Sequence, residues 1–406
     1  MKSWSRPEVP RLVGHGEAPR IWDTASARLI EAKPLAVASI YVCGITPYDS
    51  THIGHAATYL AYDTLIRLWL DAGFDVSYVQ NSTDVDDPLL ERALARKMDW
   101  RELAADQIER FRVDMAALRV IPPDHYVAVT ERIDQIAAAV KVLADRDLAY
   151  VLDGDYYFDI AAAERAEPWK LGDESTYDRD LMLVLSAERG GDPDREGKRD
   201  RLDPVLWRAE RNGEPAWPSV LGPGRPGWHI ECSVISAEFM DLPLTVQGGG
   251  ADLIFPHHEF TAAHTIALTG TRLASIYSHT GLVAFQGKKM SKSLGNLVLV
   301  SELTAAGIDP RAIRLAILGQ RYRDNWEWTD AVLTDAQSRL AGWIAWAARP
   351  IAQSSGDLTE SLRAAIADDL DTAAALAAVD SRISAGDAAT IADLAAIDAL
   401  LGIRLN

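Results

Sequence analysis

The stretch Ser39-Ile-Tyr-Val-Cys-Gly-Ile-Thr-Pro-Tyr-Asp-Ser-Thr-His-Ile-Gly-His55 decides the fold of this 406-residue chain. It opens with a β-rich run that predicts a short strand ending before Gly44. A turn and a helical pattern of apolar residues follow, and Asp75 to Gln80 predicts a second strand. Strand, helix and strand over about 40 residues indicate a βαβ unit. Such units build parallel sheets that bind ligands beyond the carboxyl ends of their strands, where Cys43 lies.

Composition and charge narrow the classes of function. The chain has 48% hydrophobic and 25% charged residues, which is ordinary for a globular protein. No segment approaches the ~18 consecutive apolar residues of a membrane span, so we expect a soluble, cytoplasmic protein with no membrane partner. The net charge of −18 counts against a large polynucleotide partner, which usually requires a basic face, although a local basic patch stays possible.

Cys43 and Cys232 are the only cysteines, and each lies in a densely patterned segment. With His257 in Phe255-Pro-His-His-Glu259, they could form a soft three-ligand metal site. Zinc favours sulfur and imidazole ligands, and three protein ligands leave one position open for a substrate. Two alternatives are a pair of buried small hydrophobes and a disulfide, although a chain of this length with two cysteines and no secretory segment favours reduced thiols.

Three further segments predict a nucleotide site. Thr51-His-Ile-Gly-His55 begins the expected helix, where free backbone N–H groups and two imidazoles on one face favour phosphate. Gly287-Lys-Lys-Met-Ser-Lys-Ser-Leu-Gly-Asn296 is a cationic loop suited to a leaving pyrophosphate. In Gln247-Gly-Gly-Gly-Ala-Asp-Leu253, glycines allow close approach and Asp252 could accept from ribose hydroxyls. The plainer alternatives are a helix cap with a surface histidine, a solvated loop and a glycine turn.

Together these segments resemble the motifs of class I aminoacyl-tRNA synthetases. His52-Ile-Gly-His55 matches their HIGH motif, and Lys289-Met-Ser-Lys-Ser293 matches their KMSKS loop. The cysteinyl branch is matched by Tyr41-Val-Cys-Gly-Ile-Thr46, by Gly224-Arg-Pro-Gly-Trp-His-Ile-Glu-Cys232 and by the segment around His257. The resemblance runs from about Ile40 to about Glu327. It implies that ATP, accompanied by Mg²⁺, and L-cysteine form cysteinyl-adenylate, with one zinc ion holding the cysteine thiolate.

The resemblance also implies the site residues. The zinc ligands are Cys43, Cys232 and His257, and the catalytic residues that stabilise the reacting phosphates are His52, His55, Lys289 and Lys292. The residues implied to contact the cysteine and the adenylate are Cys43, Gly44, Ile45, Thr46, Thr58, Asn81, Ser82, Thr83, Trp228, Gly250, Ala251, Asp252 and Val283.

Two departures from the tRNA synthetases stand out. The synthetases carry a glutamate zinc ligand four residues after the histidine, whereas this chain has Thr261, so we expect three protein ligands. His264 could be an additional ligand, but on a helix that continues from Pro256 it is expected to pack or to face solvent. In place of an anticodon-binding region, residues 351–406 contain nine acidic residues and three arginines, and their apolar spacing predicts a small antiparallel helical bundle with a structural role.

Both departures, and Glu188-Arg-Gly-Gly-Asp-Pro193, match the family of cysteine:1D-myo-inositol 2-amino-2-deoxy-α-D-glucopyranoside ligases of mycothiol biosynthesis. This resemblance implies that the amine of glucosaminyl-inositol attacks cysteinyl-adenylate, forming an amide and releasing AMP. No nucleic-acid partner and a monomer are then expected. The alternatives are a cysteinyl-tRNA synthetase and an inactive zinc- and nucleotide-binding module, against which the intact HIGH and KMSKS motifs argue.

The expected fold class is α/β: a doubly wound parallel Rossmann-type catalytic sheet with an inserted connective subdomain and a C-terminal helical bundle. The expected divisions are an N-terminal extension (1–34), the first catalytic half with the HIGH motif (35–122), the insertion (123–222), the second catalytic half with the zinc ligands and KMSKS loop (223–294), and the helical domain (295–406).

Overall fold

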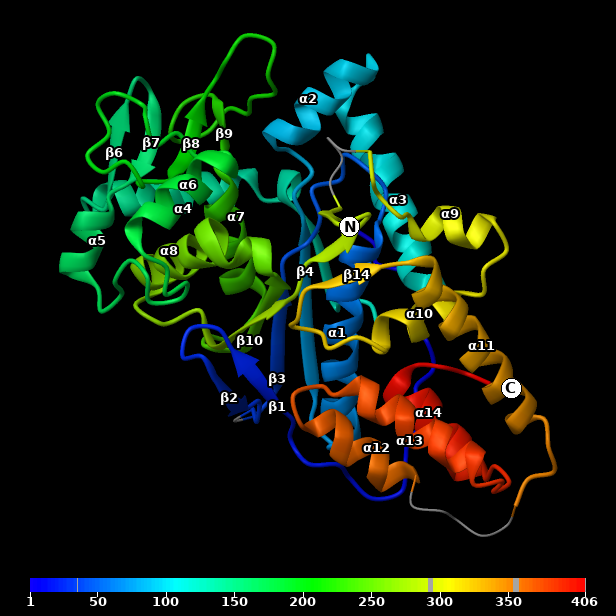
Figure 1. Ribbon diagram of the computed structural model, residues 1–406. Helices are drawn as coiled ribbons and strands as arrows, with labels where there is room; N and C mark the ends of the chain where they lie inside the picture. The colour runs from blue at the N-terminus through cyan, green and yellow to red at the C-terminus, as the bar shows by residue number, and fades with distance from the viewer. Residues whose placement is uncertain (35, 291–294, 353–357, 406) are drawn as a thin grey trace.

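A five-stranded parallel sheet forms the centre of the computed structural model, which describes residues 1–34, 36–290, 295–352 and 358–405 (Figure 1). Its strand order is β11-β10-β3-β4-β5, so strands from the two predicted catalytic halves pair at its middle. The strands are β3 (Ala38–Val42), β4 (Val76–Ser82), β5 (His125–Ala128), β10 (Leu244–Gly250) and β11 (Ala274–Thr280). The predicted strand at residues 39–43 and the predicted strand at residues 75–80 are therefore β3 and β4.

Helices cover both faces of this sheet, which confirms the doubly wound α/β class. The side chains of β3 alternate between two cores: Ile40 and Val42 join the core with helix α1 (Ile53–Asp71), whereas Tyr41 joins the core with helix α7 (Trp228–Phe239). This alternation follows from the two-residue period of a strand buried on both faces.

A second, antiparallel sheet lies in the inserted part of the chain, seen in green in Figure 1. Its order is β6-β7-β8-β9, and its last strand leads directly into α7. Its strands are β6 (Ala149–Leu152), β7 (Asp155–Phe158), β8 (Val205–Ala209) and β9 (Gly224–Pro226). The helices from β4 to this sheet and around it are α2 (Asp87–Arg96), α3 (Trp100–Ala117), η1 (Val129–Glu131), α4 (Ile133–Asp145), α5 (Ile160–Ala166) and α6 (Arg179–Glu188).

The remaining elements flank the parallel sheet. A hairpin of β1 (Arg20–Asp23) and β2 (Arg28–Glu31) lies in the N-terminal segment, and β12 (Val283–Phe285) pairs with β13 (Lys288–Lys289) and β14 (Trp326–Trp328). The other helices are η2 (Ala251–Leu253), η3 (Ile254–His258), α8 (Glu259–Thr269), α9 (Val300–Ala305), α10 (Pro310–Leu318), α11 (Asp330–Ala347), α12 (Leu358–Ala367), α13 (Thr372–Ser384) and α14 (Ile391–Leu401). Within the described ranges, none of the helices has the length and apolarity needed to cross a membrane.

The acidic C-terminal helices are fixed to the catalytic core by a buried charge cluster. Asp63 on α1 accepts a hydrogen bond from Nε of Arg67 at 2.8 Å and another from Arg314 on α10, and the three side chains are at most 1% exposed. Arg67 also donates to the carbonyl oxygens of Asp398 and Ala399, both at 3.1 Å. Burial opposes ionisation of Asp63, but the charges of Arg314 and Arg67 lower its pKa below the ordinary value. The cluster therefore holds α1, α10 and α14 together.

We predict that Asp63→Ala destabilises the protein by about 3–5 kcal/mol, because it leaves two buried guanidinium groups without their counter-charge. The measurement is the free energy of unfolding from urea denaturation. The matched control is Asp106→Ala, which removes the exposed partner of Arg110 on α3 and should cost about 0.5 kcal/mol. Equal losses in the two variants would contradict a structural role for the cluster.

Candidate active site

A cavity of about 1380 Å³ opens at the carboxyl ends of the parallel strands. Its lining includes Cys43 to Thr46 after β3, Gly250 and Asp252 after β10, and Gly281 to Val283 after β11. β3 and β10 are neighbours in the sheet but leave it toward different helices, so the cavity lies at the switch point where open α/β sheets bind their ligands.

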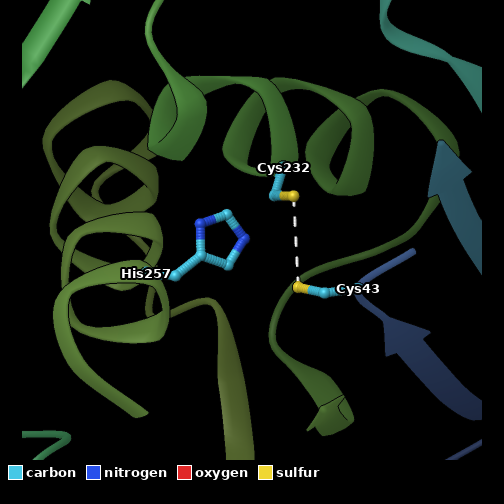
Figure 2. Close-up of side chains that lie close together, drawn as sticks. All are labelled: Cys43, Cys232 and His257. Carbon is cyan, nitrogen blue, oxygen red and sulfur yellow. Dashed lines mark hydrogen bonds between the residues drawn. The ribbon is translucent and has the colours of Figure 1, made fainter. Parts of the chain in front are cut away.

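Cys43, Cys232 and His257 converge from three elements, as Figure 2 shows, and Cys43 lines this cavity. Cys43 follows β3, Cys232 lies on α7 and His257 lies in the short π-helix η3. Their ligand-type atoms lie within 4.8 Å of one another, and the two sulfur atoms are 4.0 Å apart. A tetrahedral ion with sulfur bonds of about 2.3 Å places two thiolates about 3.8 Å apart, so the arrangement fits a soft metal ion. The cysteines are free, which excludes the disulfide alternative in this structure.

Burial shifts the pKa values of His257 and Cys232. It lowers the pKa of His257 well below its usual value, with His229 and His264 adding to the effect, so the imidazole is neutral and can donate a lone pair. Burial also raises the pKa of Cys232 well above its usual value, so that thiol keeps its proton until a cation displaces it. The hydroxyl of Thr261 donates to the carbonyl oxygen of His257 at 2.7 Å and is therefore committed to the backbone.

Neighbouring aromatic rings hold His257 in place. The Trp228 ring stacks on the imidazole at a centroid distance of 4.4 Å, and Nδ1 of His229 lies 3.1 Å from Nδ1 of His257. His264 is fully buried and packs edge-on against Phe158, so it packs rather than facing solvent. Trp228 also lines the cavity, which joins the metal cluster to the open space.

Sequence reasoning missed the second histidine of the His257-His258 pair. Nε2 of His258 lies 3.2 Å from the sulfur of Cys43, and its Nδ1 lies 2.7 Å from Nε2 of His279. The only signal in the sequence was that two histidines are adjacent, so either of them could contact a cysteine. Which of the two points at which cysteine depends on the kink at Phe255, whose backbone is extended within η3, and residue spacing does not predict such a kink.

Asn81 shapes the loop after β3. Its side-chain oxygen accepts from the backbone N–H of Gly44 at 2.8 Å, and its amide donates to Thr83 at 3.1 Å. A Cβ on Gly44 would sit 1.6 Å from the Asn81 carbonyl oxygen, so only glycine fits there. Asn81, Ser82 and Thr83 are buried and, among the described residues, do not line the cavity. Their place in the structure is beneath the Gly44 loop rather than on the cavity surface.

The predicted phosphate-binding histidines lie together at the start of α1. Their rings stack at 3.8 Å, and both line the cavity. Nδ1 of His52 also accepts from the backbone N–H of His55 at 3.3 Å, so the helix-cap alternative holds for His52 at the same time. Thr58, one turn further along, contacts Thr280 through hydroxyl oxygens 2.7 Å apart. The backbone of Lys289 belongs to β13, whereas Lys292 lies outside the described residues.

The structure thus gathers most of the predicted site residues on one surface. Those that line the cavity are Cys43, Gly44, Ile45, Thr46, His52, His55, Thr58, Trp228, Gly250, Asp252 and Val283. Cys232 and His257 are buried next to Cys43, and Ala251, between Gly250 and Asp252, is not part of the lining.

Arg189, at the end of α6, was also missed as a positioning residue. Its Nη1 donates to the carbonyl oxygen of Asp252 at 2.6 Å and to that of Phe255. One inserted side chain therefore ties together the predicted ribose-binding residue and the segment that carries His257. The sequence offered only the Arg-Gly-Gly string as a signal, since the partners are backbone atoms more than 60 positions away.

Comparisons with known proteins agree with this geometry. The family model of the class I (C) tRNA synthetase catalytic domain matches residues 31–338. The L-cysteine:1D-myo-inositol 2-amino-2-deoxy-alpha-D-glucopyranoside ligase of Clavibacter michiganensis is 58% identical, covering 100% of this chain and 99% of its own. The ligase of the same name from Acidothermus cellulolyticus is 53% identical over the full length of both chains.

Solved structures share the fold at low sequence identity. The methionyl-tRNA synthetase of Mycobacterium tuberculosis bound to methionyl-adenylate has a TM-score of 0.60 at 15% identity, covering 90% of this chain and 88% of its own. A LeuRS from Agrobacterium radiobacter has a TM-score of 0.62 at 12% identity, covering 94% of this chain and 85% of its own. These neighbours support the class I architecture alone.

We predict that Cys232→Ser lowers the affinity for a soft divalent ion by more than the about 10–100-fold typical of substitutions around, rather than at, a metal ligand. A Co²⁺ titration checks this, because thiolate ligation gives a charge-transfer absorption that serine cannot reproduce. His125→Gln, at an exposed histidine on β5, is the control and should bind like the wild type. Equal Co²⁺ affinity in wild type and Cys232→Ser would refute the centre.

Proposed function

The chain belongs to the class I (C) tRNA synthetase catalytic-domain family and, within it, to the L-cysteine:1D-myo-inositol 2-amino-2-deoxy-α-D-glucopyranoside ligases, and we propose that it catalyses the reaction for which those ligases are named. It would use ATP to join L-cysteine to the amine of glucosaminyl-inositol. The observation that carries this proposal is the convergence of Cys43, Cys232 and His257 beside a cavity that also contains the HIGH histidines. A thiol-binding centre next to a nucleotide site is what activation of cysteine by ATP would need.

The first half-reaction activates cysteine. A carboxylate oxygen of cysteine attacks the α-phosphorus of ATP, and pyrophosphate leaves with the electrons of the broken P–O bond. His52 and His55 would donate to the phosphate oxygens at the helix start, while Lys289 and Lys292 would neutralise the departing pyrophosphate. Gly250, Asp252 and Val283 would hold the nucleoside, with the glycines at the end of β10 and Gly44 after β3 letting it approach the backbone. Losing one such positioned donor typically slows the chemical step about 10²–10³-fold.

The second half-reaction forms the amide. The uncharged amine nitrogen attacks the carbonyl carbon of cysteinyl-adenylate, the nitrogen loses a proton, and AMP leaves with the electrons of the C–O bond. Thr46 and Trp228 both line the cavity and would orient the cysteinyl group. Trp228 also stacks on His257, so orientation of the substrate is coupled to the metal centre.

Zinc is the metal we propose for Cys43, Cys232 and His257, because two thiols and a neutral imidazole are the donor set that it prefers. When bound, zinc would supply a Lewis-acidic coordination position that prefers a thiolate to the hydroxyl of serine. Cysteine would then be selected without an editing site. Mg²⁺ would accompany ATP as a charge partner of its phosphates.

A cysteinyl-tRNA synthetase is the less favoured alternative. Helices α12 to α14 belong to a C-terminal segment with nine acidic residues and three arginines, a surface that tRNA phosphates should avoid. These helices instead pack on α1 and α10. We therefore propose small-molecule substrates and no nucleic-acid partner, with a cytoplasmic monomer as the form that acts.

We predict cysteine-dependent exchange of labelled pyrophosphate into ATP, and AMP release with amide formation only when glucosaminyl-inositol is added. Serine should support little exchange, since its hydroxyl is a poor ligand for a soft metal ion. Cysteinylated tRNA in a parallel assay would favour the synthetase alternative, and a chain without exchange would be a binding module. His55→Ala should retain bound metal while losing exchange by about 10²–10³-fold.

A further inference from the structure

The cavity extends well beyond the residues assigned to cysteine and the adenylate. Pockets for drug-sized ligands usually span about 300–1,000 Å³, whereas this cavity has about 1380 Å³. The additional lining comes from α2, from the end of α6 and the loop after it, and from strands β8 and β9. None of these elements carries a residue of the metal centre or of the proposed nucleotide site.

This second region, which we call the outer wall, is polar and built from charges of both signs. Arg225 on β9 is 3% exposed and is held by Glu214 at 2.8 Å and by Asp87 on α2. Arg208 on β8 lies 3.2 Å from the same Asp87. The strands of the insertion are therefore fixed to α2 by buried or half-buried ion pairs, and the wall has a defined shape before any ligand enters.

The loop at the other side of the outer wall is equally fixed. Arg189 anchors it to the carbonyl oxygens of Asp252 and Phe255. Gly191 packs against the end of α6 so closely that a Cβ would lie 2.2 Å from the hydroxyl oxygen of Ser186. Glu188, Gly190, Gly191 and Asp192 line the cavity together, so this part of the outer wall presents backbone and two carboxylates, of which Asp192 already accepts from Tyr157 and Lys198.

Two carboxylates of the outer wall are available to a ligand. Glu91 lies one turn after Asp87 on α2, and Glu188 ends α6. Both are exposed and line the cavity, and in the described part of the chain neither takes part in an ion pair or a side-chain hydrogen bond. The neighbouring charges Asp87, Arg208 and Arg225 are already paired with one another.

We propose that the outer wall is the binding site for the amino-sugar acceptor, with Glu91 and Glu188 as the carboxylates that recognise its ammonium and hydroxyl groups. This assignment rests on the proposed function. A polyhydroxylated amine needs hydrogen-bond acceptors and a nearby negative charge, and these two glutamates supply both. The outer wall is connected to the reaction centre through the backbone, because β9, which carries Arg225, leads directly into α7, which carries Trp228 and Cys232.

The same wall disfavours a polyphosphate acceptor. A nucleic-acid end carries phosphates that two unpaired carboxylates would repel, whereas the protonated amino sugar is attracted to them. The ammonium would pass its proton to water, and the uncharged amine would then attack the adenylate.

The test compares Glu91→Gln, Glu188→Gln and the double variant with wild type in two assays. We expect each single change to raise the KM for glucosaminyl-inositol about 10-fold or more, as loss of a hydrogen bond to a charged group does, and the double change to raise it further. Cysteine-dependent ATP–pyrophosphate exchange should stay within about twofold of wild type, since the removed charges lie outside the nucleotide site. Glu196→Gln, at an exposed glutamate of the insertion that does not line the cavity, is the matched control and should match wild type in both assays.

Failure of this assignment is distinct from failure of the proposed function. An unchanged acceptor KM in the double variant, with wild-type exchange, would overturn the outer wall as the acceptor site while leaving the ligase activity intact. Loss of ATP–pyrophosphate exchange in either single variant would show that this glutamate acts in the activation of cysteine. That result would also overturn its assignment to acceptor binding. A wild-type protein without exchange, or without product from the amino sugar, would instead refute the proposed function.

Discussion

The pairing of β3 with β10 is the constraint on which the whole site depends. These strands lie about two hundred positions apart in the chain, yet Ile40, Tyr41 and Val42 pair in parallel with Val246, Gln247 and Gly248. The pairing continues one step beyond β3, where the N–H of Cys43 donates to the carbonyl oxygen of Gly248 at 3.2 Å. Parallel strands end at the same edge, so this single register brings Cys43 and the glycine-rich end of β10 to one cavity.

The insertion completes that cavity rather than merely separating its halves. It leaves the parallel sheet after β5 and returns through β9 into α7, so the helix that carries Cys232 is positioned from both sides. Arg189 adds a second attachment, from the end of α6 to the backbone of Asp252 and Phe255. Arg189 therefore couples the insertion to Asp252, which lines the cavity, and to the segment that leads to His257, because one guanidinium group binds a carbonyl oxygen in each.

The sequence predicts the features that depend on neighbouring residues and the site residues that belong to recognisable motifs. The strand, helix and strand around Cys43 follow from residue periodicity, and the gathering of Cys43, Cys232 and His257 follows from their chemistry and the family pattern. The roles of His258, Asn81 and Arg189 could not be predicted, because each depends on a backbone atom or side chain brought close by tertiary packing. The same holds for the C-terminal helices. Their apolar spacing predicts them, whereas it does not predict that Arg67 and Arg314 attach them to the core.

Charge balance explains why threonine at position 261 suits a thiol-binding centre. Two thiolates and a neutral imidazole would balance a divalent ion, and burial keeps His257 uncharged. A carboxylate at position 261 would add a negative charge and would weaken the attraction for the substrate thiolate in a buried, poorly screened site. Thr261 instead gives its hydroxyl to the carbonyl oxygen of His257, which steadies the ligand without adding charge. Under the proposed function, threonine in place of the glutamate of the tRNA synthetases would leave the centre more electrophilic toward the cysteine thiolate.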